Sequence, residues 1–244
     1  MEQQVMDEVE KLGTIVSIWA HPDDETYLAG GLMAAAVANG QRVVCVSATV
    51  GEHGTDDPVG WPPERLGRTR RWEAAAAMAV LGVTDHRFLG YPDGGMAALD
   101  PAGPVERIAA LLADVAPDTV LTFGPDGGTF HPDHQTISAW VGAAWDRAGR
   151  PGRLLHATMT AEHLATWGER YEQWQVFMTD ERPVGVAPEE LAVDLRLTGV
   201  ALDCKIAALL AMHTQVAPAV ALLGMDDFRA LNAGEAFIEA PPAP

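Results

Sequence analysis

The 244-residue sequence has few cysteines and no long apolar run. Its two cysteines, Cys45 and Cys204, lie far apart and form no CxxC pair, which argues against a disulfide framework or a thiolate metal site. No stretch approaches the roughly 18 apolar residues that a membrane span needs, and the acidic start lacks the apolar core of a signal peptide. We therefore expect a cytoplasmic protein with no membrane partner.

Basic residues are also scarce. Sixteen Lys and Arg stand against 34 Asp and Glu, which gives a formal net charge of -18. This charge repels phosphate backbones, so we expect no nucleic-acid partner and favour a neutral or cationic small molecule. GxGxxG, GxxxxGK[ST] and GxSxG are absent, so no sequence motif supports a nucleotide cofactor or a serine nucleophile. A homo-oligomer is left open.

What the sequence does contain is a regular alternation of apolar runs and helix-forming segments. Such alternation predicts parallel strands with helices on both faces, that is, a single-domain α/β fold with a Rossmann-like, doubly wound, mostly parallel sheet. One domain over residues 1–244 is expected, with 1–12 and 240–244 frayed and 179–193 a loop. Strands are predicted at residues 14–20, 42–49, 86–89, 119–123, 154–158 and 174–178, and helices at 25–38, 63–81, 104–115, 133–149, 161–172 and 200–213.

Two histidine-containing strings follow predicted buried strands. His21-Pro-Asp-Asp-Glu comes directly after the first strand, and His131-Pro-Asp-His134 comes after residues 119–123 and a seven-residue loop. In open α/β sheets, ligands bind outside the carboxyl ends of the strands. The position of both strings therefore marks them as candidates for a functional site.

Imidazole nitrogen and carboxylate oxygen are the ligands that zinc takes in catalytic sites, where three protein ligands leave a position for water. His21, Asp24 and His134 can supply such a set. Iron(II) suits the same ligands. Asp23 would then be free to accept a proton from an activated water, and His131, one helical turn before His134, could stabilise a developing oxyanion or donate a proton. The residues thus predict a metal-dependent hydrolase.

Helix capping is the competing interpretation of these strings. Proline at the first helical position and acidic residues in the first turn are typical helix starts, so each string alone could be no more than a cap. Two copies, each after a buried strand and sharing a His-Pro-Asp core, favour the metal site.

At these motifs the sequence resembles the PIG-L/LmbE-like family of zinc-dependent N-acetylglucosaminyl de-N-acetylases. Matching strings extend the resemblance over nearly the whole chain: Thr49-Val-Gly-Glu52, Arg70-x-x-Glu73, Leu89-Gly-Tyr-Pro-Asp-Gly94 and, more weakly, Lys205 to Gln215. The resemblance implies a Zn²⁺ ion on His21, Asp24 and His134, Asp23 as general base and His131 as stabiliser or acid.

The resemblance also implies that Glu52, Arg70 and Asp93 contact the sugar. One departure is that some relatives carry a tyrosine where this chain has Thr129, so Thr129, Tyr27 or Tyr91 would have to substitute, or the oxyanion would rely on the metal and His131.

The expected activity is removal of an N-acyl group, acetyl in the first place, from an amino sugar or its conjugate. Two alternatives stay open: an amidase acting on a thiol conjugate or an acylated antibiotic sugar, and a metal-holding sugar-binding protein without catalysis. Trp61, beside Pro62 and Pro63, is a candidate to stack on the substrate.

Overall fold

The computed structural model describes residues 2–241. Its centre is a seven-stranded sheet with the strand order β3-β2-β1-β4-β5-β7-β6. The predicted doubly wound arrangement is confirmed, because the chain moves outward from β1 to β3 on one side and crosses to β4 and β5 on the other. The strands are β1 (Ile15–Trp19), β2 (Val43–Ser47), β3 (Asp85–Phe88), β4 (Thr119–Phe123), β5 (Arg153–Ala157), β6 (Val193–Arg196) and β7 (Gly234–Glu239).

The sheet is mostly parallel. Strands β1 to β5 pair in parallel, whereas β7 runs antiparallel to both β5 and β6. Every residue of β1, β2 and β4 is buried, which explains their nearly continuous apolar sequences: helices cover both faces of these strands.

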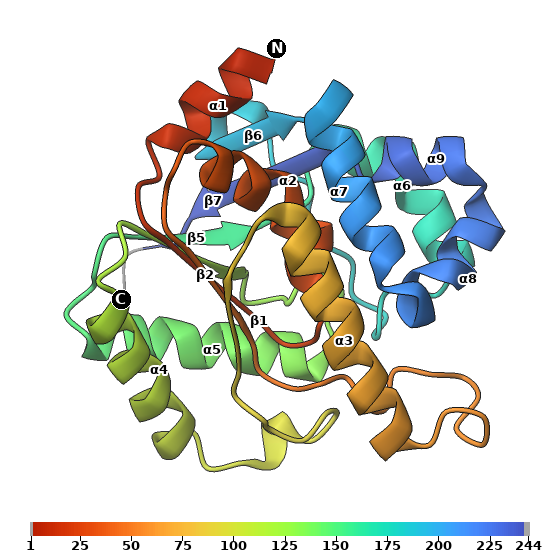
Figure 1. Ribbon diagram of the computed structural model, residues 1–244, viewed down its shortest axis with the longest axis horizontal. Coiled ribbons are helices and arrows are strands. Elements are labelled where there is room, and N and C mark those ends of the chain that lie inside the picture. The colour runs from red at the N-terminus through yellow and green to blue at the C-terminus, as the bar shows by residue number, and fades with distance from the viewer. Residues whose placement is uncertain (1, 242–244) are drawn as a thin grey trace.

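Helices form a layer on each side of the sheet (Figure 1). Helices α2, α3 and α7 pack together on one face, α4 and α5 pack together on the other, and α6, α8 and α9 gather at one end. The helices are α1 (Glu2–Glu10), α2 (Asp24–Ala38), α3 (Pro63–Leu81), α4 (Ala102–Val115), α5 (Pro132–Arg147), α6 (Ala161–Gln173), α7 (Gly199–Ala211), α8 (His213–Leu223) and α9 (Met225–Leu231), with short 3₁₀ turns η1 (Met96–Ala98) and η2 (Pro188–Glu190).

The strand predicted at residues 174–178 is wrong. Helix α6 ends at Gln173, Trp174 caps it, and Gln175 has a left-handed φ of 53°, so the chain turns away from the sheet. The apolar side chains of Trp174 and Val176 line a cavity instead of a sheet face. Strands β6 and β7 and helices α8 and α9 were not predicted, and β6 begins within the expected loop 179–193.

The chain start also differs from the prediction. Residues 2–10, expected to be frayed, form α1, and Val5, Val9 and Leu12 are buried in the core. Near the other end, the Ala240 amide donates to the Leu154 carbonyl at 2.8 Å. Residues 1 and 242–244, also expected to be frayed, lie outside the described residues.

No single helix within residues 2–241 has the length and apolar composition of a membrane span. Helices α7 and α8 meet these criteria only as a pair, and they are bent by 116° relative to each other.

Candidate metal centre

The first motif lies between β1 and α2. His21 follows the strand by two residues, and Asp24 is the first residue of α2, where its charge also complements the positive end of the helix dipole. The His21 amide donates to Asp24 Oδ2 at 2.8 Å, so the carboxylate is held beside the imidazole. Burial raises the pKa of Asp24, but His134 and His21 outweigh this effect and hold the pKa well below its usual range. Asp24 is therefore an anion that could serve as a metal ligand.

The second motif begins α5, with Pro132 at the first helical position and His134 in the first turn. His134 Nδ1 donates to the carbonyl oxygen of Gly127 at 3.0 Å, which leaves Nε2 as the free nitrogen. Gly127 has a φ of 68°, and a Cβ on it would lie 2.7 Å from the Cβ of His134. The loop can approach the imidazole this closely because residue 127 is glycine.

The three side chains predicted as metal ligands meet at one point. His134 Nε2 lies 3.2 Å from His21 Nδ1, and the two oxygens of Asp24 lie 3.5 Å from His21 Nδ1 and from His134 Nε2. In a tetrahedral zinc site with bonds of about 2.0–2.2 Å, neighbouring ligand atoms are about 3.3–3.6 Å apart. His21 Nδ1 and His134 Nε2 are thus close to the spacing that such an ion requires, and each faces a different oxygen of the Asp24 carboxylate.

The other nitrogen of His21 faces carboxylates. Nε2 lies 3.1 Å from Asp93 Oδ1 and 3.4 Å from Asp133 Oδ2, so in the neutral ring it carries the proton and Nδ1 is the nitrogen that could bind a metal. Burial lowers the pKa of His21, but hydrogen bonds to Asp133, Asp24 and Asp93 outweigh it and hold the pKa well above its ordinary value. These contacts orient the imidazole.

Asp133 was not assigned a role from the sequence. Its side chain is fully buried, Oδ2 accepts from the Gly94 amide at 2.7 Å, and Oδ1 accepts from the Met96 amide at 3.2 Å. The sequence did contain a signal for this residue, since Asp133 belongs to the His-Pro-Asp core that both motifs share. Two sets of donor atoms are clustered among the described residues, the imidazoles of His21, His131 and His134 and the group of His21, Asp93 and Asp133. In the second group the carboxylates support His21.

Asp23 lies beside these ligands in an unusual backbone conformation. Its φ of 131° is rare for a residue with a side chain, and such strain is concentrated at functional sites. Arg70 Nη2 donates to Asp23 Oδ2 at 3.2 Å. Burial raises the pKa of Asp23 to about 6, although Arg70 acts in the opposite direction. A carboxyl group with a raised pKa suits a general base.

The residues expected to contact the sugar are engaged with the protein. Arg70 is buried and donates to the carbonyls of Gly51 (2.7 Å) and Pro22 (2.6 Å), in addition to its bond with Asp23. Glu52 Oε1 accepts from the Asp93 amide at 3.1 Å, while Oε2 is buried and has no hydrogen-bond partner among the described residues. In these positions Arg70 and Asp93 orient Asp23 and His21.

His131 packs against the ligand imidazoles, with ring centroids 4.9 Å from His21 and 4.8 Å from His134. Its Nδ1 accepts from the Asp133 amide at 3.1 Å, so the proton of the neutral ring is on Nε2. Burial, together with His134 and His21, lowers the pKa of His131 to about 4. At neutral pH the residue is therefore an uncharged hydrogen-bond donor.

The structure distinguishes among the three residues that could substitute for the tyrosine of some relatives. Thr129 Oγ1 lies 3.4 Å from His134 Nδ1, and Thr129 and Tyr27 both line the cavity at the ligands. Tyr91 instead packs its ring against Trp140, with centroids 5.2 Å apart. Trp61 lies under the Arg65 guanidinium at 4.5 Å and does not line this cavity, so the suggestion that it stacks on substrate finds no support here.

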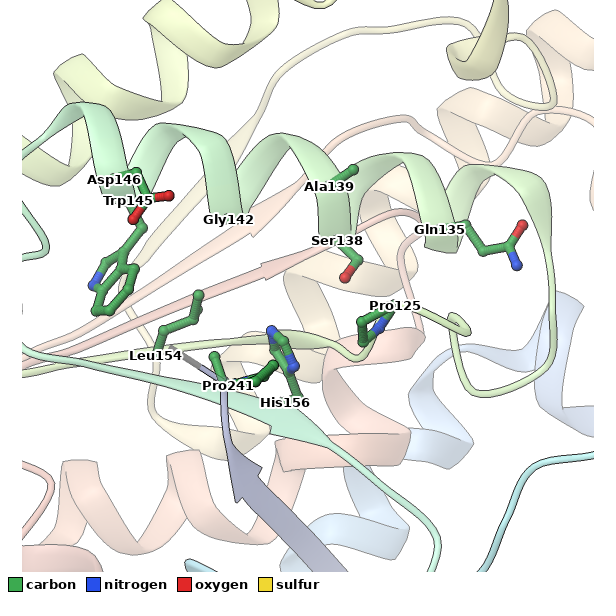
Figure 2. A pocket seen from close by; sticks show the side chains of 11 residues that line it. Pro125, Gln135, Ser138, Ala139, Gly142, Trp145, Asp146, Leu154, His156 and Pro241 are labelled. Atoms are coloured by element: carbon green, nitrogen blue, oxygen red, sulfur yellow. The ribbon is translucent and has the colours of Figure 1, made fainter. Parts of the chain in front are cut away.

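Two cavities lie near these elements. The larger, of about 780 Å³, begins at Asp24, Thr129 and His134 and extends to α6, α8 and α9. The smaller, of about 260 Å³, lies between α5 and β5, where Figure 2 shows side chains of α5 facing His156 and Leu154. None of the proposed ligands lines the smaller cavity within the described part of the chain, so the larger one serves the site.

The fold and the cluster of imidazoles and carboxylates define a class of α/β protein with a candidate metal site at the carboxyl edge of the sheet, between β1 and β4. The sequence profile of PIG-L, described as GlcNAc-PI de-N-acetylase, matches residues 16–145. The chain belongs to the PIG-L family.

Relatives with curated names support this assignment. A 1D-myo-inositol 2-acetamido-2-deoxy-alpha-D-glucopyranoside deacetylase 2 of Catenulispora acidiphila is 32% identical and matches 83% of this chain and 80% of its own length. The corresponding deacetylase of Saccharomonospora viridis is 34% identical over 59% of this chain, a match that spans 62% of that protein.

Among solved structures, the N,N'-diacetylchitobiose deacetylase of Pyrococcus horikoshii superimposes with a TM-score of 0.65 at 18% identity. The match covers 97% of this chain and 87% of that one. At this identity the superposition demonstrates the shared fold.

Proposed function

We propose that this protein is a zinc-dependent hydrolase that removes an N-acyl group, acetyl in the simplest case, from an amino sugar or an amino-sugar conjugate. The observation that carries the proposal is the approach of His21 Nδ1, Asp24 and His134 Nε2 to within 3.2–3.5 Å, beside Asp23 and at the start of a cavity. Membership of the PIG-L family and the deacetylase names of its relatives support the reaction type.

The charges around the ligands fit a divalent cation. Four carboxyl groups surround the imidazoles: Asp23, Asp24, Asp93 and Asp133. The guanidinium of Arg70 contacts the carboxyl group of Asp23. A zinc ion held by His21, Asp24 and His134 would polarise the amide carbonyl and acidify a water molecule.

Asp23 acts as general base in this proposal. Its carboxylate is adjacent in sequence to Asp24 but is directed to Arg70 and does not take part in the ligand contacts, so it remains available for a proton. Arg70 also donates to the carbonyls of Pro22 and Gly51. These bonds hold the loop after β1, which contains Asp23, against the loop after β2. Arg70 is thus a positioning residue.

His131 acts on the developing oxyanion. Because its Nδ1 is occupied by the Asp133 amide, Nε2–H is the group that it can offer. An oxyanion donor contributes about 3 kcal/mol to catalysis. Tyr27 and Thr129 line the large cavity beside the ligands and are proposed to take the place of the tyrosine found in some relatives.

In the complete reaction, water adds to the amide carbonyl and Asp23 takes one of its protons. The C–N bond then breaks, the nitrogen receives a proton, and the products are a carboxylate and a free amine. Glu52 is proposed to support substrate binding by holding the Asp93 loop, since its Oε1 accepts from the Asp93 amide at 3.1 Å.

Replacement of Asp23 by Asn tests this function. We expect amine release from N-acetylglucosamine conjugates to fall about 10²–10⁴-fold in kcat, the range of general-base catalysis. Elemental analysis should still find one zinc per chain in D23N, whereas His134→Ala should lose it. Asp56→Asn, an exposed carboxylate in the loop after β2, is the matched control. Unchanged turnover in D23N would refute the role of Asp23. If elemental analysis finds iron instead of zinc, the metal in the proposal is iron.

A further inference from the structure

The large cavity differs in chemistry from the other side of the ligand cluster. Arg70, Glu52, Asp93 and His131 lie outside the cavity lining, and all of them offer polar or charged groups. Inside the cavity, the side chains next to the ligands are Tyr27, Leu28 and Phe123, which are largely apolar. The ligands therefore stand between a cluster of polar side chains and a cavity whose lining is mostly apolar.

The apolar character continues along the cavity. Trp167, Tyr171 and Trp174 of α6 line one part, and Leu222, Leu223 and Phe228 of α8 and α9 line another. Charged groups also line the cavity: Asp126 in the loop before α5, the buried Glu235, and the exposed ion pair of Arg196 with Glu162. An occupant that starts at the ligands thus meets a lining in which aromatic and aliphatic side chains predominate.

The size of the cavity exceeds what an acetyl group needs. At about 780 Å³ it lies within the range of sites that enclose drug-sized molecules. A methyl group would leave most of this apolar volume without a partner. A longer hydrocarbon chain would fill it and remove both the chain and the cavity wall from water.

We propose that the cavity holds the acyl chain of the substrate, and that this chain is a medium-length hydrocarbon, not only acetyl. This inference rests on the proposed function, because hydrolysis at the ligands divides the substrate into two parts. The hydrocarbon belongs on the side of Tyr27 and Trp167, and the polyhydroxylated amine belongs on the opposite side of the ligands, toward Glu52 and Asp93. Cleavage of the C–N bond then gives a fatty carboxylate in the cavity and the free amino sugar outside it.

The first test is a chain-length series. N-acetyl, N-butanoyl, N-hexanoyl and N-octanoyl glucosamine are compared by amine release. We expect kcat/KM to rise by up to about fourfold per buried methylene, the equivalent of its transfer free energy. A decrease from acetyl to octanoyl would overturn the inference while leaving the hydrolase intact.

Two matched variants locate the effect. Ala219→Phe on α8 narrows the large cavity and should lower octanoyl cleavage more than acetyl cleavage, so that the preference for octanoyl is lost. Ala139→Phe, at an exposed position of α5 that belongs to the lining of the smaller cavity, should leave the preference unchanged. Circular dichroism of both variants confirms that they fold. Equal preferences in the two variants would contradict the assignment of the cavity.

Binding of octanoate gives a readout that does not depend on turnover. Trp167 and Trp174 line the cavity, so we expect octanoate to change the tryptophan fluorescence of the wild type and of A139F, and to bind at least tenfold more weakly to A219F. If no N-acyl sugar is cleaved but octanoate binds in this pattern, the hydrolase proposal fails and the cavity assignment stands. Absence of octanoate binding overturns the cavity assignment, whichever substrates are cleaved.

Discussion

Gly127 shows how a residue without a side chain contributes to the metal centre. Its carbonyl oxygen fixes the tautomer of His134, and its left-handed conformation lets the loop pass within contact distance of the imidazole. The sequence predicted the two histidines and Asp24 because these residue types bind metals. It could not predict the backbone carbonyl, nor that Asp93 and Asp133 support His21, because these contacts depend on how separate loops fold together.

Substitution of Gly127 by Ala should weaken metal binding. The new Cβ would collide with His134, and loss of the carbonyl contact should lower zinc affinity about 10–100-fold, the usual effect of disturbing a group that orients a ligand. A chelator competition measures this. Gly142→Ala is the control. Gly142 lies within α5, a Cβ added there would meet open space, and the variant should leave zinc affinity unchanged. Equal affinities in G127A and the wild type would contradict the proposed contact.

At the scale of elements, prediction succeeded where burial on both faces imposed a pattern. Strands β1, β2 and β4 are fully buried and were predicted within a few residues. Strand β6 alternates buried and exposed residues over four positions, which is too short a signal, and β7 begins with glycine and contains two glutamates. Both become strands because β7 pairs with the open edge of β5, a tertiary effect that local sequence does not contain.

Helix α7 was predicted, but its buried charge was not. Lys205 Nζ lies 2.9 Å from Glu235 Oε1, and both side chains are fully buried, so this ion pair joins α7 to β7. Glu235 also accepts from the amides of Gly31 and Leu32 in α2. The pair therefore links the last strand to two helices of the same layer.

Replacement of Lys205 by Met should destabilise the protein by about 3–5 kcal/mol, because it leaves the carboxylate of Glu235 buried without a counter-charge. Urea denaturation measures the loss. The double variant with Glu235→Gln should recover part of it, since the uncompensated charge is removed. Lys11→Met, at an exposed lysine, is the control and should change stability little. If Lys205→Met alone is as stable as the wild type, the ion pair contributes no net stability.

At the scale of the whole molecule, the fold places its two motifs at the point where the strand order reverses, between β1 and β4. The strand order brings the ends of β1 and β4 together, so residues 21 and 134 become neighbours although more than a hundred positions separate them. This juxtaposition was predictable from two buried strands and two similar motifs. The cavity was not, because α8, α9 and the segment after α6 that enclose it were missed or assigned differently.

Stability should fall in acid. Burial, with Arg71 nearby, lowers the pKa of His86 to about 4, and its Nε2 lies 2.9 Å from Ser47 Oγ. Between pH 6.5 and 4 the unfolded chain binds a proton at this residue and the folded chain does not, so the free energy of unfolding decreases as the pH falls through this window. Urea denaturation from pH 7 to 4 should show a shallower decrease in His86→Gln than in the wild type. His53→Gln, at an exposed histidine, should retain the wild-type slope, and identical slopes in all three proteins would exclude His86 as a contributor.

Strand β7 is the only partner that β6 has among the strands of the described sheet, although β6 comes first along the chain. The outer edge of the sheet is therefore assembled out of sequence order. A truncation before residue 234 would remove two strands from the sheet instead of one, and would uncover the hydrogen-bonding edge of β5, which another chain could then occupy.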